Sequence, residues 1–185
     1  MSTRKKVFLG IGAILLIVVG YLAYIMLTTR SHSPAAVTEY QQNGMDIRID
    51  YCQPYKKERL IFGTHQEGAL LPHGKYWRLG ANEATKLTLG SSVNFGGQDL
   101  QAGTYSLYAF PNADNWVIGI NSKADRWGAT PPDFGDDVGR VKIPVTSTNE
   151  SMEQFTISIA SNGSDAVMLM QWDQTKVEVP LKSVD

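Results

Sequence analysis

The sequence contains a single cysteine, Cys52, and three histidines in 185 residues. A lone cysteine excludes a disulfide within the chain, so the fold must rest on its core. Metal-binding spacings such as H-x-H and H-E-x-x-H do not occur, and neither do the G-x-S-x-G and G-x-x-x-x-G-K-[ST] motifs. The sequence therefore carries no signature of a metal centre, a serine nucleophile or a phosphate-binding loop.

Basic residues are also scarce once the N-terminal segment is set aside. The whole chain has 17 basic and 18 acidic residues, and residues 1–31 contain four of the basic ones and no acid. The remainder has 13 basic residues (17 less 4) and 18 acidic ones, a net charge of −5. Such a domain offers no basic stripe for phosphates, so nucleic acid is not an expected partner.

The chain does have one long apolar run. Residues 7–28, VFLGIGAILLIVVGYLAYIMLT, contain no charged residue. At about 1.5 Å per residue, a helix of this length spans roughly 33 Å, which exceeds a bilayer core of about 30 Å. The run is longer than the apolar region of about 7–15 residues in a cleaved signal peptide, and no A-x-A site follows it. We therefore expect an uncleaved transmembrane anchor.

The charges around the apolar run predict its orientation. Arg4, Lys5 and Lys6 precede it and a single Arg30 follows it, so the positive-inside rule places the N-terminus in the cytoplasm. We expect a single-pass protein of the cytoplasmic membrane with a periplasmic or otherwise extracytoplasmic domain. The expected parts are a cytoplasmic N-terminus (1–6), a transmembrane anchor (7–28), a linker (29–34) and an extracytoplasmic β domain (35–185).

Beyond the anchor the sequence alternates between strands and turns. MDIRIDYC (45–52) places apolar residues on one side and polar ones on the other, as in a half-buried strand. GTYSLYAF (103–110) and NWVIGIN (115–121) flank the turn PNAD. No segment has a sustained 3.6-residue period, so we predict an antiparallel β-sandwich or barrel-like domain. The stretch 121–139 is long for a loop, which is typical of functional or mobile segments.

The segment WRLGANEAT (77–85) is the first candidate site, because it gathers five kinds of polar or aromatic group around a Gly-Ala pair. Its pattern predicts a strand, an irregularity and a second strand. In one interpretation Trp77 stacks on a ligand and Arg78 holds an anion, while Asn82 and Glu83 supply hydrogen bonds or a base. This mixture suits a sugar or a small carboxylate. In the other, Arg78 and Glu83 form a buried pair and Asn82 stabilises a bulge.

Three further residues belong to the candidate ligand-binding or catalytic set. Thr85 shares a strand face with Glu83, His73 follows a proline at the rim, and Trp127 lies in the long loop. Trp127 can stack on a sugar ring or cover the core. If the site is catalytic, Glu83, Arg78 and His73 are the expected residues. The histidines and the acidic PPDFGDD turn lack a metal-ligand spacing, so we expect neither a metal nor a cofactor.

Several segments together resemble the DUF2911 family, from roughly residue 33 to residue 181. They are YCQPYKKERLIFG, LLPHGKYWRLGANEAT, GGQDLQAGTYSLYAFPNADNWVIGIN and WDQTKVEVP. The resemblance implies an exported β-rich domain and supplies no activity, because this bacterial family has no established function. The chain departs from the family's usual opening, since Cys52 and Gln53 stand where Ser and Arg are usual, and Glu58 where Gly is usual.

Two functions from different classes follow. The first is a membrane-anchored, noncatalytic binding or accessory module of the cell envelope, with a small-molecule or sugar ligand or an envelope protein as partner. The alternative is an envelope enzyme that acts on a carbohydrate or small carboxylate through Arg78, Asn82 and Glu83. The lack of a catalytic motif favours the first. Burial of Arg78 and Glu83, or their exposure in a cleft, separates the two.

Overall fold

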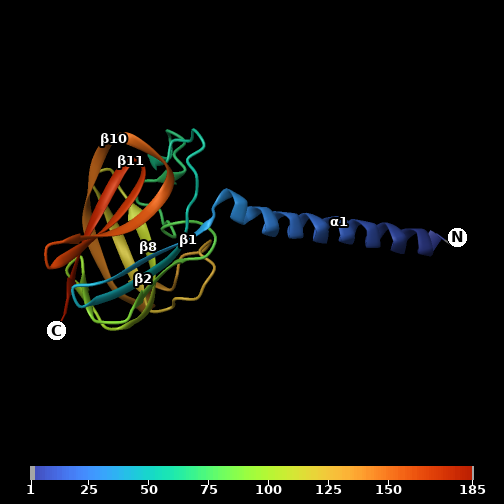
Figure 1. Ribbon diagram of the computed structural model, residues 1–185. Helices are drawn as coiled ribbons and strands as arrows, with labels where there is room; N and C mark the ends of the chain where they lie inside the picture. The colour runs from blue at the N-terminus through green and yellow to red at the C-terminus, as the bar shows by residue number, and fades with distance from the viewer. Residues whose placement is uncertain (1–2, 185) are drawn as a thin grey trace. The chain divides into compact units, whose positions relative to one another are not determined.

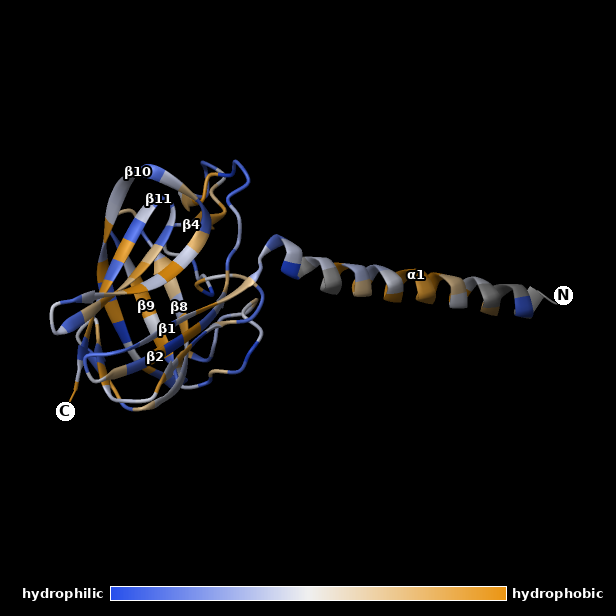
Figure 2. Ribbon diagram, viewed as in Figure 1, coloured by the Kyte–Doolittle hydropathy of each residue, from blue (hydrophilic) through white to orange (hydrophobic). Residues whose placement is uncertain are grey.

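The computed structural model describes residues 3–184, and the contacts within the chain divide it into two units. The first unit is a single helix, α1 (Thr3–His32). Its segment Gly10–His32 is long and apolar enough to span a membrane, and Figure 2 shows hydrophobic residues along the middle of the helix. The helix continues through the residues predicted as a linker, so only Ser33 and Pro34 separate it from the first strand.

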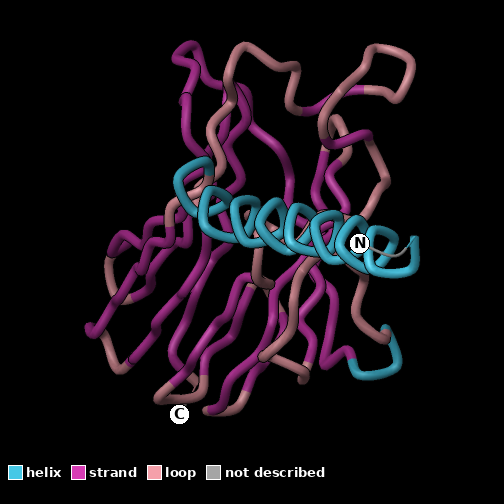
Figure 3. The backbone as a smooth tube through the Cα atoms, turned by 90° about the vertical axis from the view of Figure 1, so that its right-hand side faces the viewer, coloured by secondary structure: helices cyan, strands magenta, loops and turns pink. Residues whose placement is uncertain are grey.

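The second unit begins at Ser33 and is built from strands, which confirms the prediction of an antiparallel β domain. The strands curve through the whole unit in Figures 1 and 3. Their bounds are β1 (Ala35–Gln42), β2 (Met45–Cys52), β3 (Phe62–Gly63), β4 (Leu71–Pro72), β5 (Thr85–Leu89), β6 (Val93–Phe95), β7 (Gln98–Leu100), β8 (Gly103–Pro111), β9 (Asn115–Asn121), β10 (Asp137–Asn162) and β11 (Asp165–Ser183), with a short 3₁₀ helix, η1 (Phe134–Asp136).

Nine strands form one bent antiparallel sheet in the order β1-β2-β5-β8-β9-β10-β11-β6-β7. The long strand β10 links its two halves: its first part pairs with β9 and its second part with β11. Among the described residues, β1 and β7 remain edges of this sheet, so it does not close into a barrel. Side chains instead tie β1 to β10, where the Thr38 hydroxyl donates to the carbonyl of Ile157 at 2.7 Å.

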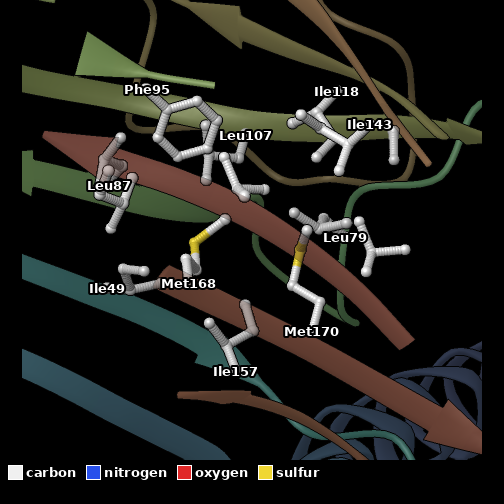
Figure 4. Close-up of a cluster of buried hydrophobic side chains, with 14 of the residues drawn as sticks. Ile49, Leu79, Leu87, Phe95, Leu107, Ile118, Ile143, Ile157, Met168 and Met170 are labelled. Carbon is white, nitrogen blue, oxygen red and sulfur yellow. The ribbon is translucent and has the colours of Figure 1, made fainter. Parts of the chain in front are cut away.

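The core lies between the two halves of the bent sheet. Alternating residues of each strand point inward, as the alternation in sequence predicts. Figure 4 shows members of this core, among them Ile49, Leu87, Leu107 and Ile118 together with Met168 of β11. All five are 1% exposed or less, so the packing between the halves is tight. Cys52 is also buried at the end of β2.

The other face of β8 and β9 has a second, smaller layer. The connection from β9 to β10 returns across it and brings Phe134 of η1 onto the rings of Tyr108 and Phe110, at centroid distances of 5.6 and 6.0 Å. This connection is the long loop noted in the sequence, and it is an ordered cover for one sheet face. The candidate site lies where the start of this loop meets the WRLGANEAT segment.

Candidate functional site

The WRLGANEAT segment pairs with β8 at both of its ends and forms a loop between them, which we call the excursion (residues 78–84). Trp77 pairs with Ala109 of β8, and Thr85 pairs with Leu107, only two residues away along the same strand. The seven residues between them, 78–84, therefore leave the sheet and return to it. The Thr85 N–H lies 3.5 Å from the Arg78 carbonyl and closes the excursion at its base. The predicted irregularity and the strand after it, β5, are present, whereas the predicted strand before it is reduced to a single isolated bridge at Trp77.

Tight backbone turns fold the excursion. Leu79 and Asn82 have φ values of +56° and +60°, in the left-handed region that side chains other than glycine and asparagine rarely adopt. Gly80 has φ of +154°, and a side chain there would lie 2.9 Å from the Cys52 carbonyl oxygen. The glycine thus lets the excursion pack directly on the end of β2.

Asn82 joins three parts of the domain. Its side-chain amide lies 3.5 Å from the carbonyl of Ser33 and 3.7 Å from the sulfur of Cys52. Its own carbonyl accepts hydrogen bonds from Arg78 Nη1 at 3.1 Å and from the N–H of Gly128 at 3.0 Å. Asn82 is 6% exposed, so these contacts replace water for almost all of its polar atoms.

We predict that Asn82→Ala lowers the free energy of unfolding by about 2 kcal/mol. Alanine adopts the left-handed conformation at a cost of about 1–2 kcal/mol, and it loses the side-chain contacts to Ser33 and Cys52. Asn82→Gly is the matched control, because glycine accepts this backbone conformation and loses the same contacts. Chemical denaturation of both variants measures the difference. Equal destabilisation would show that the backbone conformation contributes nothing.

The excursion also holds the start of the long loop. The Ala84 N–H donates to the Arg126 carbonyl at 3.1 Å, and Glu83 forms a β-bridge with Trp127. Gly128 packs on the Arg78 side chain so closely that a Cβ there would lie 2.7 Å from Arg78 Cδ. Trp127 itself is 57% exposed, so it does not cover the core. The loop is therefore fixed by its backbone while its indole faces solvent.

Two arginines, Arg78 and Arg126, lie at this junction. Arg126 donates to the Tyr76 hydroxyl at 2.9 Å and to the Thr130 carbonyl at 2.8 Å, and its guanidinium lies 5.9 Å from the centre of the Tyr76 ring. Burial of Arg78 lowers the pKa of its guanidinium, Tyr76 opposes this shift, and repulsion from the positive charge of Arg126 adds to it. We call Arg78 and Arg126 the arginine pair; Tyr76 lies beside them.

The positive charge of this pair is not balanced by a neighbouring acid. Within residues 3–184, neither Arg78 nor Arg126 forms an ion pair with a carboxylate. Arg126 Nε is also buried and has no hydrogen-bond acceptor in the described chain. Buried donors are normally satisfied, and one that is not calls for an explanation such as a bound water or ion. The neighbouring Asp125 instead pairs with Lys86 at 2.5 Å.

A second polar network, which sequence reasoning missed, lies under η1. The Tyr108 hydroxyl donates to Asp137 at 2.5 Å, and the same carboxylate accepts from Asn121 at 2.9 Å and from Arg140 at 2.8 Å. Burial, and then the hydrogen bond to Asp137, raise the pKa of Tyr108. The Arg140 guanidinium lies 4.7 Å from the centre of the Phe134 ring. All these groups satisfy one another, which is typical of a structural network.

Asp137 shows why this network was missed. In sequence it belongs to PPDFGDD, which reads as a solvated acidic turn, yet its side chain is only 9% exposed. The alternation of β8 places Tyr108 opposite the core residues Leu107 and Ala109, and this was the available signal. It could not identify the partner, because Asp137 lies 29 residues farther along the chain.

The structure brings together only part of the predicted site. Trp77, expected as a stacking wall, is 4% exposed and stacks on Trp172 in the core at 5.8 Å. Thr85 is 1% exposed and donates to the Leu79 carbonyl at 2.6 Å. Arg78 and Glu83 are half-buried, and Trp127 is exposed beside them. The groups that remain near the surface are therefore Arg78, Glu83 and Trp127, to which the structure adds Arg126.

Glu83 and His73 have other neighbours. The thiol of Cys52 lies 3.6 Å from a carboxylate oxygen of Glu83. His73 follows the short strand β4, and its N–H donates to the Gly63 carbonyl at 2.8 Å. Its charge acts on Glu67, whose pKa is lowered first by hydrogen bonds from Thr64 and to a smaller extent by His73. Across the described residues, no group of three or more His, Cys, Asp or Glu could hold a metal ion.

Comparison with known proteins gives one finding on ancestry. The model of the family described as "Protein of unknown function (DUF2911)" matches residues 33–181, which is nearly the whole β unit. The chain therefore belongs to this family, and the resemblance seen in its sequence motifs is confirmed. Searches of the curated proteins and of the solved structures gave no match.

Proposed function

We propose that this member of the DUF2911 family is a membrane-anchored, noncatalytic binding module of the cell envelope, and that it binds a small anion at the arginine pair. One observation carries the proposal. Arg78 and Arg126 are both half-buried at the junction of the excursion and the long loop, and no carboxylate within residues 3–184 forms an ion pair with either. Charged groups in such a position are normally paired, so an anion from outside the protein is the missing partner.

The geometry suits a carboxylate or a phosphate group. A guanidinium presents its N–H groups in a planar fork that matches the oxygens of either group, and it stays charged at all physiological pH values. The Tyr76 hydroxyl and the exposed indole of Trp127 border the pair and can contact the rest of the ligand. A sugar acid or another small carboxylate fits this combination of cations and an aromatic ring.

The neighbouring residues support binding rather than catalysis. Asn82 is occupied by the scaffold, and Thr85 donates to the backbone of the excursion. The remaining acid, Glu83, is held at the β-bridge to Trp127 and lies against the Cys52 thiol. The alternative function, an enzyme, requires Arg78, Asn82 and Glu83 to contact one substrate. The side chain of Asn82 instead contacts Ser33 and Cys52, which disfavours that arrangement.

Ligand binding can be tested by titrating the full chain, held in micelles of an uncharged detergent that contains no phosphate, with inorganic phosphate and with glucuronate. A ligand that binds only the folded state stabilises it by about 2.7 kcal/mol at a concentration of about 100 Kd. For a domain of this size the unfolding midpoint should then rise by several degrees. Arg126→Gln and Arg78→Gln should each weaken binding by about tenfold to a hundredfold, the equivalent of one charged hydrogen bond.

Lys123→Gln is the matched control, because it removes one positive charge from the same loop and leaves the arginine pair intact. Its side chain is 68% exposed and forms a long ion pair with Asp136 at 3.9 Å. This variant should bind both anions as the unmodified chain does. If Lys123→Gln and Arg126→Gln lowered the anion affinity equally, the binding would depend on the total charge of the domain and not on the arginine pair, which would contradict the proposal. The proposal would also be contradicted if neither anion bound the unmodified chain.

The membrane topology in the proposal has a separate test. The helix segment Gly10–His32 supports anchoring by its length and apolar character. The excess of basic residues before it supports an exported C-terminal unit. Alkaline phosphatase fused after Asp185 should therefore be active, because the enzyme folds into its active form only outside the cytoplasm. A stable but inactive fusion would show that the β unit stays inside.

A further inference from the structure

Trp127 differs from the other three tryptophans of the chain. Trp77, Trp116 and Trp172 are 4% exposed or less and belong to the core, whereas the Trp127 indole is 57% exposed. A large exposed indole is costly to leave in water, and tryptophan is enriched at membrane interfaces because its ring is apolar and its N–H is polar. The backbone around it is fixed by the excursion, so its exposure belongs to the fold.

The position of Trp127 is fixed close to the point where the chain enters the β unit. The Ser33 carbonyl contacts the Asn82 side chain at 3.5 Å, and the Asn82 carbonyl accepts from the N–H of Gly128 at 3.0 Å. One residue and two hydrogen bonds therefore separate Ser33 from the neighbour of Trp127. The adjoining Pro34 is held as well, because its carbonyl accepts from the N–H of Gln53 at 2.9 Å.

The covalent chain limits how far Ser33 can lie from the membrane. The apolar run ends at Thr28, and the helix continues through His32. Four further helical residues add about 6 Å along the axis. The headgroup layer adds roughly 5–7 Å to each side of the hydrocarbon core, so Ser33 emerges at the outer boundary of this layer.

We infer that the edge formed by Arg126, Trp127 and Arg78 rests on the phospholipid headgroups of the membrane that holds α1. In this arrangement Trp127 enters the headgroup region, and the arginine pair binds a lipid phosphate. The inference rests on the proposed function and names the source of its anion. Guanidinium groups bind phosphate oxygens in the same fork geometry as carboxylates, and the lipid phosphate is the anion with the highest local concentration at Ser33.

The charge of the rest of the β unit restricts this contact to one edge. Residues 32–185 carry a net charge of −5, so an anionic bilayer repels most of the surface. Next to Trp127, by contrast, Arg78 and Arg126 form no ion pair with an acid in the part of the chain that the structure describes, and the local acid Asp125 is paired with Lys86. The net charge therefore favours lipid contact at this edge over contact at the rest of the surface.

Tryptophan fluorescence of the full chain in nanodiscs can test this arrangement, because α1 contains no tryptophan. The nanodiscs contain phosphatidylcholine and phosphatidylglycerol, with a spin label placed either at the headgroup or at the middle of the acyl chain. The headgroup label should quench about half or more of the Trp127 emission and the acyl label much less. Trp127→Phe should remove the quenched component and leave the three buried tryptophans unchanged. Unquenched Trp127 emission with either label would overturn the inference.

The arginine contact is tested in the same nanodiscs. Arg126→Gln should reduce the quenching of Trp127 by the headgroup label at least twofold, whereas Lys123→Gln should leave it unchanged. Quenching that does not respond to Arg126→Gln would overturn the contact with lipid phosphate. Free phosphate that binds the arginine pair while Trp127 remains unquenched would overturn the membrane contact and leave the proposed function standing. If Arg126→Gln changes neither the affinity for free anions nor the quenching of Trp127 by the headgroup label, both proposals fail.

Discussion

Trp77→Ala should lower the free energy of unfolding by about 3–5 kcal/mol, the usual cost of removing a buried tryptophan. The Trp77 ring lies at the centre of an aromatic cluster, with centroids 4.9 Å from Phe155, 5.4 Å from Trp116 and 5.8 Å from Trp172. Its indole N–H also donates to the Gly80 carbonyl at 3.0 Å, so the change loosens the excursion as well. Chemical denaturation followed by far-UV circular dichroism measures the loss.

Trp127→Ala is the control for this prediction, since it deletes the same side chain from an exposed position. In the absence of a ligand or a lipid its cost should stay within about 0.5 kcal/mol, as for most surface substitutions. The two variants distinguish a tryptophan that packs in the core from one that is exposed and available to a ligand, the two roles that the sequence left open. Similar costs for Trp77→Ala and Trp127→Ala would contradict the assignment of Trp77 to the core.

Gly119→Ala should cost about 3 kcal/mol or more. Gly119 on β9 lies against the flat face of the Tyr108 ring, and a Cβ at this position would overlap the ring itself. Tyr108 is fully buried and cannot swing away without breaking its hydrogen bond to Asp137 and its packing on Phe134. Overpacking of this kind typically costs about 1–3 kcal/mol, and a lost hydrogen bond to a charged group adds about 1.5–3 kcal/mol.

A double-mutant cycle attributes this cost to the overlap. In a Tyr108→Leu background the ring is gone, so the added cost of Gly119→Ala should fall to about 1 kcal/mol or less. Thermal or chemical unfolding of the two single variants and the double variant gives the coupling energy. Additive costs would mean that Gly119 is required for a reason other than the Tyr108 ring.

The strand pattern was predictable because alternation along a strand is a local property. MDIRIDYC places Met45, Ile47 and Ile49 on the buried face, and the structure has them 2% exposed or less. The role of Trp77 was not predictable in this way. Its neighbours in sequence are polar, and only the packing of Trp172, which lies 95 positions away, makes it a core residue.

The excursion was likewise predictable in part: its presence could be read from the sequence, but its contacts could not. Its glycine and asparagine marked an irregularity, because Gly80 and Asn82 tolerate backbone conformations that other residues resist. The segments that the excursion contacts were decided by the tertiary structure. Arg126 entered the site through hydrogen bonds between the long loop and residues 82–84, and no spacing in the sequence links these two segments.

By itself the sequence determined the length and apolar character of the helix, the antiparallel β class, the family and the segment in which to search. These follow from composition, from a two-residue period and from short motifs typical of the family, all of which are read within a few residues. The tertiary structure decided which of the polar residues became scaffold and which stayed near the surface. It placed Asn82 and Thr85 among buried hydrogen bonds, and it brought Arg126 to Arg78, because burial and charge balance depend on neighbours that are distant along the chain.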